Sequence, residues 1–179
     1  MKVIGLAGWS GAGKTTLLTR LIPHLAGQGL RVSTVKHAHH GFDVDTPGKD
    51  SWMHRQAGAS EVLVASGKRW ALMAELRGAA EPPLAELLGK LAPVDLVIVE
   101  GFKTSPIRKI EVHRAGNDKP LLYPGDPTIA AIATDAMLDT ALPVVGLDDI
   151  AAIAALVMRF ASPRDGLPVA PALDRGNRG

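Results

Sequence analysis

Hydrophobic residues along this chain gather in two kinds of segment that alternate. Continuous apolar runs at 3–7 and 96–99 are typical of parallel strands that are buried on both faces of a sheet. After Lys14 the apolar residues instead recur with helical spacing, as they do again from Leu84 and from Asp149. The alternation predicts an α/β protein in which helices cover a mostly parallel central sheet, giving three layers.

Shorter segments complete this predicted framework. They are a short helix at 50–56 and strands at 31–36, 110–113, 129–133 and 144–145. There is no internal repeat and no sign of a second domain, so we expect one domain over residues 1–161. From Ser162 onward glycine and proline recur without periodicity, and residues 162–179 are predicted to form a disordered tail.

Residues 62–65 and 70–73 predict a β-hairpin with an unusual surface. Both strands are apolar on both faces, and a polar turn at 66–69 joins them. A hairpin exposed to water on one face alternates apolar and polar residues. Some other surface is therefore expected to cover the second face of this hairpin.

The strongest chemical signal follows the first predicted strand. Residues 8–15 read GWSGAGKT and fit the pattern G-x-x-x-x-G-K-[ST], between a predicted strand and a predicted helix. Small residues allow backbone N–H groups to converge on phosphate oxygens, and the start of the helix adds a favourable dipole. Lys14 would reach the β- and γ-phosphates, and Thr15 would offer its hydroxyl to Mg²⁺.

A phosphate loop of this kind also needs a carboxylate to hold the metal. The apolar strand at 96–99 delivers Glu100 at its carboxyl end, where sheets of this type bind their ligands. Glu100 is therefore the predicted metal ligand. Asp95 lies at the opposite end of that strand and is expected to face away from the nucleotide.

A polar loop after the second predicted strand carries further candidates, namely His37, His39, His40, Asp43 and Asp45. The imidazoles could bind a transition metal, although the chain lacks the Cys or acidic ligands that complete a tight zinc site. One of the carboxylates, with Asp45 our choice as metal ligand, could reach the Mg²⁺ or orient a water. The loop could also be polar and solvated only.

Base recognition is less clearly marked. Asn117-Asp118-Lys119 does not form the N-K-x-D signature with which many GTPases read guanine. Asp135 follows an apolar strand and could accept the N1–H and N2–H of guanine, whereas adenine offers no matching donors. A helix or turn cap is the alternative role for Asp135.

Composition narrows the class of protein. The 179 residues include no Cys, and 20 Lys and Arg against 18 Asp and Glu give a net charge of +2. This excludes a disulfide scaffold and gives no electrostatic sign of nucleic-acid or membrane-surface binding. No apolar run is long enough to span a membrane, and we expect a cytoplasmic protein.

Several loops together resemble one family. Residues 8–16 read GWSGAGKTT, and further matching segments are VKH at 35–37, HH at 39–40, DVD at 43–45, PGKDS at 47–51, RWA at 69–71 and VEGFK at 99–103. Over about residues 1–160 the chain resembles the molybdopterin-guanine dinucleotide biosynthesis adapter family, MobB. The match is specific because unrelated loops agree in order.

This resemblance implies a homodimeric P-loop protein that binds GTP and Mg²⁺ and has at most weak GTPase activity. Its implied role is to assist the attachment of GMP to molybdopterin. Its implied partners are the molybdenum cofactor guanylyltransferase and molybdenum-insertion proteins, with molybdopterin itself a further candidate. The apolar hairpin would then be used for dimerisation. The nucleotide contacts assigned in this way are Gly11, Gly13, Lys14, Thr15 and Thr16, with Glu100 and an acidic residue of 43–45 near the metal. Gly8 and Ala12 of the same loop complete the predicted nucleotide-binding residues.

Other functions share the same phosphate site. A small-molecule kinase or an ATP-dependent ligase would bind an acceptor near Lys103, but a kinase normally needs an arginine-rich lid, which this sequence lacks. A GTPase that delivers a metal ion is a third alternative, weakened by the absence of Cys. No general base is evident, and no motif places an arginine finger, although Arg55, Arg69 and Arg108 stay open.

Overall fold

The computed structural model describes residues 1–38 and 41–166, and these form two compact units. The first comprises Met1–His37 and the chain from Pro83 onward, and the second comprises Ala38–Pro82. Within the described part of the chain, no helix is long and apolar enough to cross a membrane.

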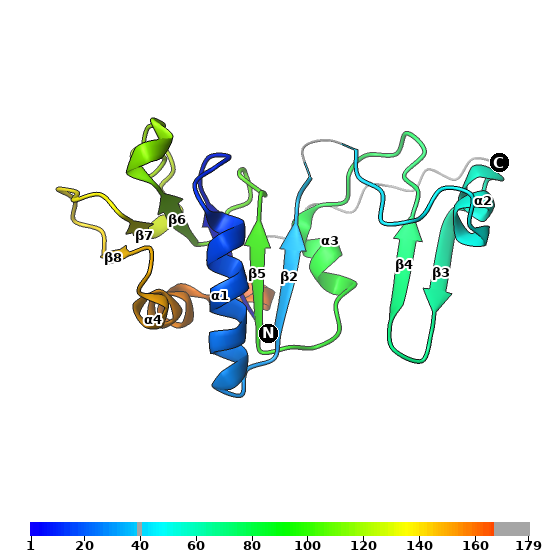
Figure 1. The fold of residues 1–179 in the computed structure, drawn as a ribbon, viewed down its shortest axis with the longest axis horizontal. Coiled ribbons are helices and arrows are strands. Elements are labelled where there is room, and N and C mark those ends of the chain that lie inside the picture. Colours follow the sequence, from blue (N-terminus) through cyan, green and yellow to red (C-terminus); the bar gives the residue numbers. More distant parts are fainter. Residues whose placement is uncertain (39–40, 167–179) are drawn as a thin grey trace. The chain divides into compact units, whose positions relative to one another are not determined.

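The first unit is built on one sheet (Figure 1). Its strands follow the order β2-β5-β1-β6-β7-β8, with every neighbouring pair parallel. These strands are β1 (Lys2–Ala7), β2 (Val32–Lys36), β5 (Leu96–Glu100), β6 (Lys109–His113), β7 (Ile129–Thr134) and β8 (Val144–Gly146). A mostly parallel central sheet is therefore confirmed.

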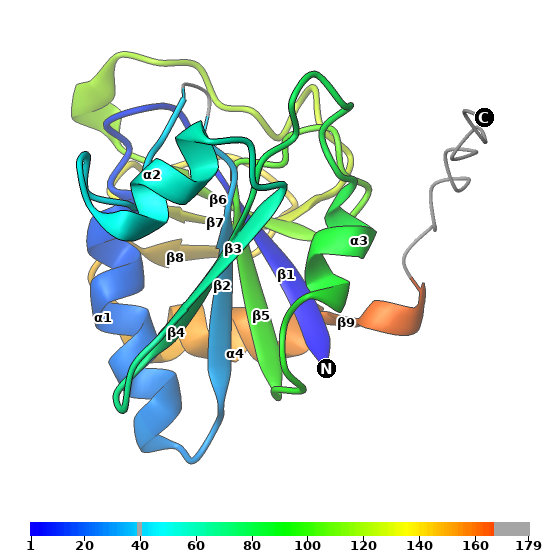
Figure 2. The ribbon, with the colours of Figure 1, turned by 90° about the vertical axis from the view of Figure 1, so that its right-hand side faces the viewer.

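Helices cover both faces of this sheet, because its strands are apolar on both sides (Figure 2). Ile4 and Ile98 face the cluster made with α1 (Lys14–Gly27) and α4 (Ile150–Phe160). Their neighbours Val3 and Val97 face the opposite cluster, made with α3 (Leu84–Gly89). The period of two along each strand thus divides the core into two layers, and the three-layer arrangement is confirmed.

Residues at the start of the predicted tail are paired in the structure. Ser162 and Pro163 form the short strand β9 (Ser162–Pro163), which runs antiparallel to the first residues of β1. The backbone N–H of Arg164 then donates to the Met1 carbonyl at 3.1 Å, and a 3₁₀ helix covers Arg164–Gly166. The pattern of glycine and proline gave no sign of this pairing. The rest of the predicted tail, 167–179, lies outside the described residues.

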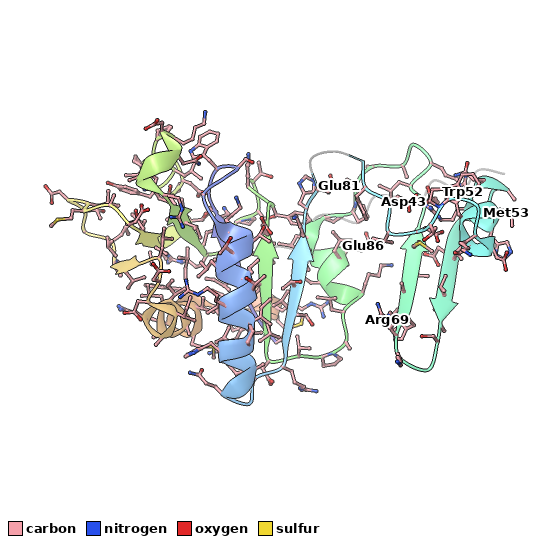
Figure 3. The ribbon with its side chains drawn as sticks, in the orientation of Figure 1. Asp43, Trp52, Met53, Arg69, Glu81 and Glu86 are labelled. Atoms are coloured by element: carbon pink, nitrogen blue, oxygen red, sulfur yellow. The ribbon has the colours of Figure 1, made fainter. Side chains whose placement is uncertain are left out.

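The second unit contains α2 (Asp50–Gln56) and an antiparallel hairpin of β3 (Glu61–Ala65) and β4 (Trp70–Ala74), as the sequence predicts. Figure 3 shows Trp52 and Met53 on α2 and Arg69 at the turn of the hairpin. Along the hairpin, Leu63 lies opposite Leu72, and Ala65 lies opposite Trp70. Leu63, Trp70 and Leu72 are 61%, 65% and 44% exposed, so this face is apolar and open.

Candidate functional site

The phosphate loop lies between β1 and α1, at the carboxyl end of a central strand. Three of its glycines adopt left-handed backbone angles, with φ of 147° at Gly8, 81° at Gly11 and 93° at Gly13. A side chain at Gly8 would also collide with the Val112 carbonyl of the neighbouring strand. The motif needs glycine at these positions because the backbone itself must turn sharply and pack closely there.

Lys14 opens α1 and folds back over its own loop. Its Nζ donates hydrogen bonds to the Gly8 carbonyl at 2.7 Å and the Trp9 carbonyl at 3.0 Å. Burial holds the pKa of Lys14 below its ordinary value, and the positive charges of Lys103 and Lys36 act in the same direction. The ammonium group is thus held at the mouth of the loop, where a phosphate could replace the carbonyls as its partner.

The remaining predicted contacts surround that ammonium group. Thr15 and Thr16 are exposed in the first turn of α1, where hydroxyl and backbone N–H groups are available to a ligand. Ala12 is buried, at 2% exposure, and packs into the core with the helices. Its backbone N–H donates to the Trp9 carbonyl at 3.2 Å, so Ala12 holds the shape of the loop.

Glu100 ends β5 directly beside the loop-bearing strand. It lies in register with Leu6 of β1 on one side and Lys36 of β2 on the other. The following residue, Gly101, has φ of 101°, and a Cβ there would lie 2.9 Å from the His37 carbonyl. The negative charge of Glu100 acts on Lys14 and opposes the lowering of its pKa. Glu100 and Thr15 therefore offer the oxygen ligands that Mg²⁺ prefers, near the same ammonium group.

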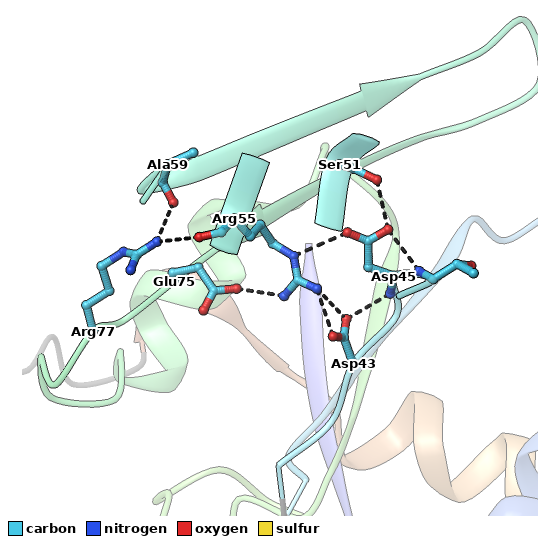
Figure 4. A network of polar contacts seen from close by, with 8 residues as sticks. Asp43, Asp45, Ser51, Arg55, Ala59, Glu75 and Arg77 are labelled. Carbon is cyan, nitrogen blue, oxygen red and sulfur yellow. Dashed lines mark hydrogen bonds and ion pairs between the residues drawn. The ribbon is translucent and has the colours of Figure 1, made fainter. Parts of the chain in front are cut away.

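Asp45 takes part in a polar network inside the second unit (Figure 4). Its carboxylate accepts from the Ser51 hydroxyl at 2.8 Å and from Arg55 Nε at 3.2 Å, and its side chain is only 8% exposed. Both carboxylate oxygens are thus already hydrogen-bonded by residues of 38–82. The metal role of Asp45 stays a prediction.

Arg55 is the centre of this network, which we call the Arg55 hub and define as Arg55 with Asp43, Asp45 and Glu75. Its guanidinium bonds Asp43 at 2.7 Å and Glu75 at 2.8 Å in addition to Asp45. Hydrogen bonds from Arg55 hold the pKa of Asp43 below its usual range. Arg55 was one of the residues considered as an arginine finger. Its donors instead join α2 to the 43–46 turn and to Glu75, the residue after β4.

Asp135 follows β7 and holds the turn after β6. Its Oδ1 accepts the backbone N–H of Ala115 at 2.7 Å, and this bond lowers the pKa of Asp135. Arg114 Nη1 lies 3.5 Å from the other carboxylate oxygen. The structure thus supplies the turn-capping role, and the reading of guanine by Asp135 stays a prediction.

A segment that the motifs did not mark also contacts the phosphate loop. We call residues 114–120 the flanking segment. Asn117 Nδ2 donates to the Ser10 carbonyl at 3.0 Å, and Trp9 Nε1 donates to the Pro120 carbonyl at 2.7 Å. The Arg114 guanidinium lies beside Gly13, with Nη2 3.5 Å from the position of a Cβ on that glycine.

Buried Glu111 secures the turn that follows this segment. Its side chain is 1% exposed, and its two oxygens accept the backbone N–H groups of Leu122 at 2.7 Å and Tyr123 at 2.9 Å. A polar residue inside the apolar strand at 110–113 was the one signal in the sequence that could have indicated such a role.

Of the histidines in the 37–45 loop, His37 lies against an aromatic ring. His37 packs its ring on Phe102, with centroids 5.0 Å apart. His39 and His40 lie outside the described residues. In the portion of the chain that the structure describes, no group of three His, Cys, Asp or Glu side chains is arranged to hold a metal ion.

The sheet order, the phosphate loop and the carboxylate on the adjacent strand define an α/β protein of the P-loop NTPase class. A family model described as "Molybdopterin guanine dinucleotide synthesis protein B" matches residues 3–135. The chain belongs to this family, MobB, as its loops suggested.

Individual relatives agree with this membership. The chain is 40% identical over 167 residues to the molybdopterin-guanine dinucleotide biosynthesis adapter protein of Escherichia coli K12, covering 92% of this chain and 95% of that protein. The protein of the same name from Haemophilus influenzae is 42% identical over 153 residues, covering 85% of each. A crystal structure of molybdopterin-guanine biosynthesis protein B superposes with a TM-score of 0.70 at 28% identity, covering 88% of this chain and 98% of that one.

Proposed function

We propose that this protein is an adapter in the biosynthesis of molybdopterin guanine dinucleotide, and that it acts by binding GTP with Mg²⁺. The observation that carries the proposal is a preformed phosphate loop in a chain that matches the Escherichia coli adapter over nearly the whole length of both proteins. A cytoplasmic location, with the guanylyltransferase and molybdenum-insertion proteins as partners and molybdopterin as a further ligand, is part of the same proposal.

Residues of the loop would hold the nucleotide. Lys14 and the backbone N–H groups of 11–16 bind the phosphates, with Gly8 setting the turn. Thr15 and Glu100 would hold Mg²⁺, which neutralises charge on the β- and γ-phosphates when bound. Asp135 is held by the Ala115 N–H, and its carboxylate offers acceptor oxygens that would suit the donor edge of guanine.

Turnover by this site would be slow. No sequence motif marks a general base for this site. Arg55, one of the arginines considered above as a finger, is already bonded to the carboxylates of the Arg55 hub. Arginine fingers accelerate GTP hydrolysis by roughly 10³–10⁵-fold, and a site without one retains only slow hydrolysis. We therefore propose a weak intrinsic GTPase whose main task is binding.

Calorimetric titration with GTP and with ATP, each with Mg²⁺, tests the proposal. We expect GTP to bind about tenfold to a hundredfold more tightly, because a hydrogen bond to a charged group contributes roughly 1.5–3 kcal/mol. Asp135→Asn keeps an oxygen for the Ala115 N–H and should remove the preference. Equal binding, or a preference for ATP, would contradict the adapter proposal and favour a kinase or a ligase.

The exposed hairpin supports a homodimer. Leu63, Trp70 and Leu72 form an open apolar face that water solvates poorly, and a second copy of the chain could cover it. We expect Leu72→Lys to convert a dimer into a monomer in sedimentation velocity at micromolar concentration. Met137→Lys is the matched control, since Met137 is fully exposed on the first unit. A Leu72→Lys variant that sediments as a dimer would place the interface elsewhere.

A further inference from the structure

The two sides of the phosphate loop carry different charged groups. On the β5 side lie Glu100, Lys36 and Lys103, whose charges all act on Lys14. On the other side the sheet order places β6 and β7, which are followed by Arg114 and Asp135. The loop therefore separates a group of residues around the predicted metal ligand from a second charged pair.

This asymmetry orients a bound nucleotide. Mg²⁺ held by Glu100 would neutralise charge at the γ end of the nucleotide, which would place that end on the side of Glu100. The α-phosphate and the nucleoside would then extend over Gly13 and the start of α1, toward the ends of β6 and β7. Arg114 is the cation that the structure places on that path, since its Nη2 lies 3.5 Å from the position of a Cβ on Gly13.

Asp135, the present partner of Arg114, would compete only weakly with a phosphate for its guanidinium. The Arg114 side chain is 48% exposed, and Nη1 lies 3.5 Å from Asp135 Oδ2, too far for a good hydrogen bond. Exposed ion pairs of this kind contribute little, whereas a guanidinium close to a phosphate gains charge-assisted hydrogen bonds. The backbone of Arg114 is already positioned, because its carbonyl accepts the Asn117 N–H at 3.0 Å and Asn117 holds Ser10.

We propose that Arg114 binds the α-phosphate of the nucleotide. The proposal rests on nucleotide binding as proposed above, but not on the choice between GTP and ATP. On binding, Arg114 exchanges Asp135 for the phosphate, and Asp135 keeps its orientation through the Ala115 N–H. The contact between Arg114 and the α-phosphate is thus independent of the γ-phosphate, so Arg114 does not act as an arginine finger.

The test compares Arg114→Ala with wild type in titrations with GTP, GDP and ATP. An α-phosphate contact predicts that the affinity for all three falls by the same factor, about tenfold to a hundredfold. Arg114→Lys should recover part of the loss because it keeps the charge without the planar fork. Arg31→Ala is the matched control, because Arg31 makes an equally loose pair with Asp95, 3.6 Å apart, at the opposite end of the sheet.

Each other outcome overturns the proposal in a distinct way. If Arg114→Ala leaves the affinities unchanged, Arg114 does not contact the nucleotide. If Arg114→Ala weakens the binding of GTP but not of GDP, Arg114 contacts the γ-phosphate instead. A loss confined to guanine nucleotides makes it a base contact. A thermal melt of each variant separates these results from unfolding. If wild type prefers ATP, the proposed adapter function fails, and a further titration with ADP beside that with ATP still tests the Arg114 contact. If wild type binds no nucleotide, both proposals fail.

Discussion

Glu111→Gln is expected to lower the free energy of unfolding by about 2–4 kcal/mol, a large part of the stability of a domain this size. Glu111 is 1% exposed, and each of its oxygens accepts one backbone N–H, from Leu122 and from Tyr123. Glutamine has one acceptor oxygen, and its amide N–H₂ would face a second N–H donor. One buried donor is then left without a partner, which costs more than the bond contributed.

Urea unfolding followed by circular dichroism measures this change. The midpoint should fall while the slope stays constant, because the surface exposed on unfolding is nearly the same. Glu61→Gln is the control, since Glu61 is exposed at the start of β3. A Glu111→Gln variant with the same midpoint as this control would mean that the two N–H groups find other partners and that Glu111 does not fix the 122–123 turn.

The shape of the loop between β1 and α1 could be predicted from the sequence because its parts are contiguous. Gly8, Gly13 and Lys14 lie within seven residues, and each has a requirement that residue type alone reveals: a left-handed turn, a close approach or a positive charge. The position of Glu100 followed from a second local rule, since it ends an apolar strand, and its metal role stays a prediction. The parallel sheet followed from the same strands, whose burial on both faces leaves continuous apolar runs.

The Arg55 hub could not be predicted in this way. Arg55 meets Asp45, Asp43 and Glu75, which lie 10, 12 and 20 positions away along the chain. No periodicity of a helix or a strand links these separations. Each charged residue alone reads as a solvated side chain, and only the turn at 43–46 and the hairpin bring them together.

The contacts of the flanking segment could not be predicted from the sequence for a different reason. Asn117 was considered only for the N-K-x-D signature, which it does not satisfy, but the structure uses its side chain to hold the Ser10 carbonyl, 107 positions away. The Trp9 indole likewise meets the Pro120 carbonyl, 111 positions away. Backbone carbonyls exist at every residue, so a side chain that bonds one leaves no mark in the sequence of its partner.

Lys14→Ala is expected to weaken nucleotide binding by about a hundredfold or more, equivalent to roughly 2.7 kcal/mol. The Lys14 ammonium now donates to the carbonyls of Gly8 and Trp9, and a phosphate that replaces them offers a full negative charge instead of a dipole. The fold should survive, because those carbonyls lie in an accessible loop where water can take the place of Nζ. Titration with GTP and Mg²⁺, together with a thermal melt, measures both effects.

Two further variants make this result specific to the site. Lys68→Ala removes an exposed lysine from the hairpin turn and should leave the affinity unchanged, which excludes an effect of net charge. Glu100→Gln should retain binding in the absence of metal but lose the gain that Mg²⁺ provides, because the amide is a poorer ligand than the carboxylate. Glu100 and Lys14 interact electrostatically. If Lys14→Ala weakens nucleotide binding but Glu100→Gln leaves the gain from Mg²⁺ unchanged, the phosphate site stands and Glu100 is not a metal ligand. Wild-type affinity in Lys14→Ala would instead contradict the phosphate site itself.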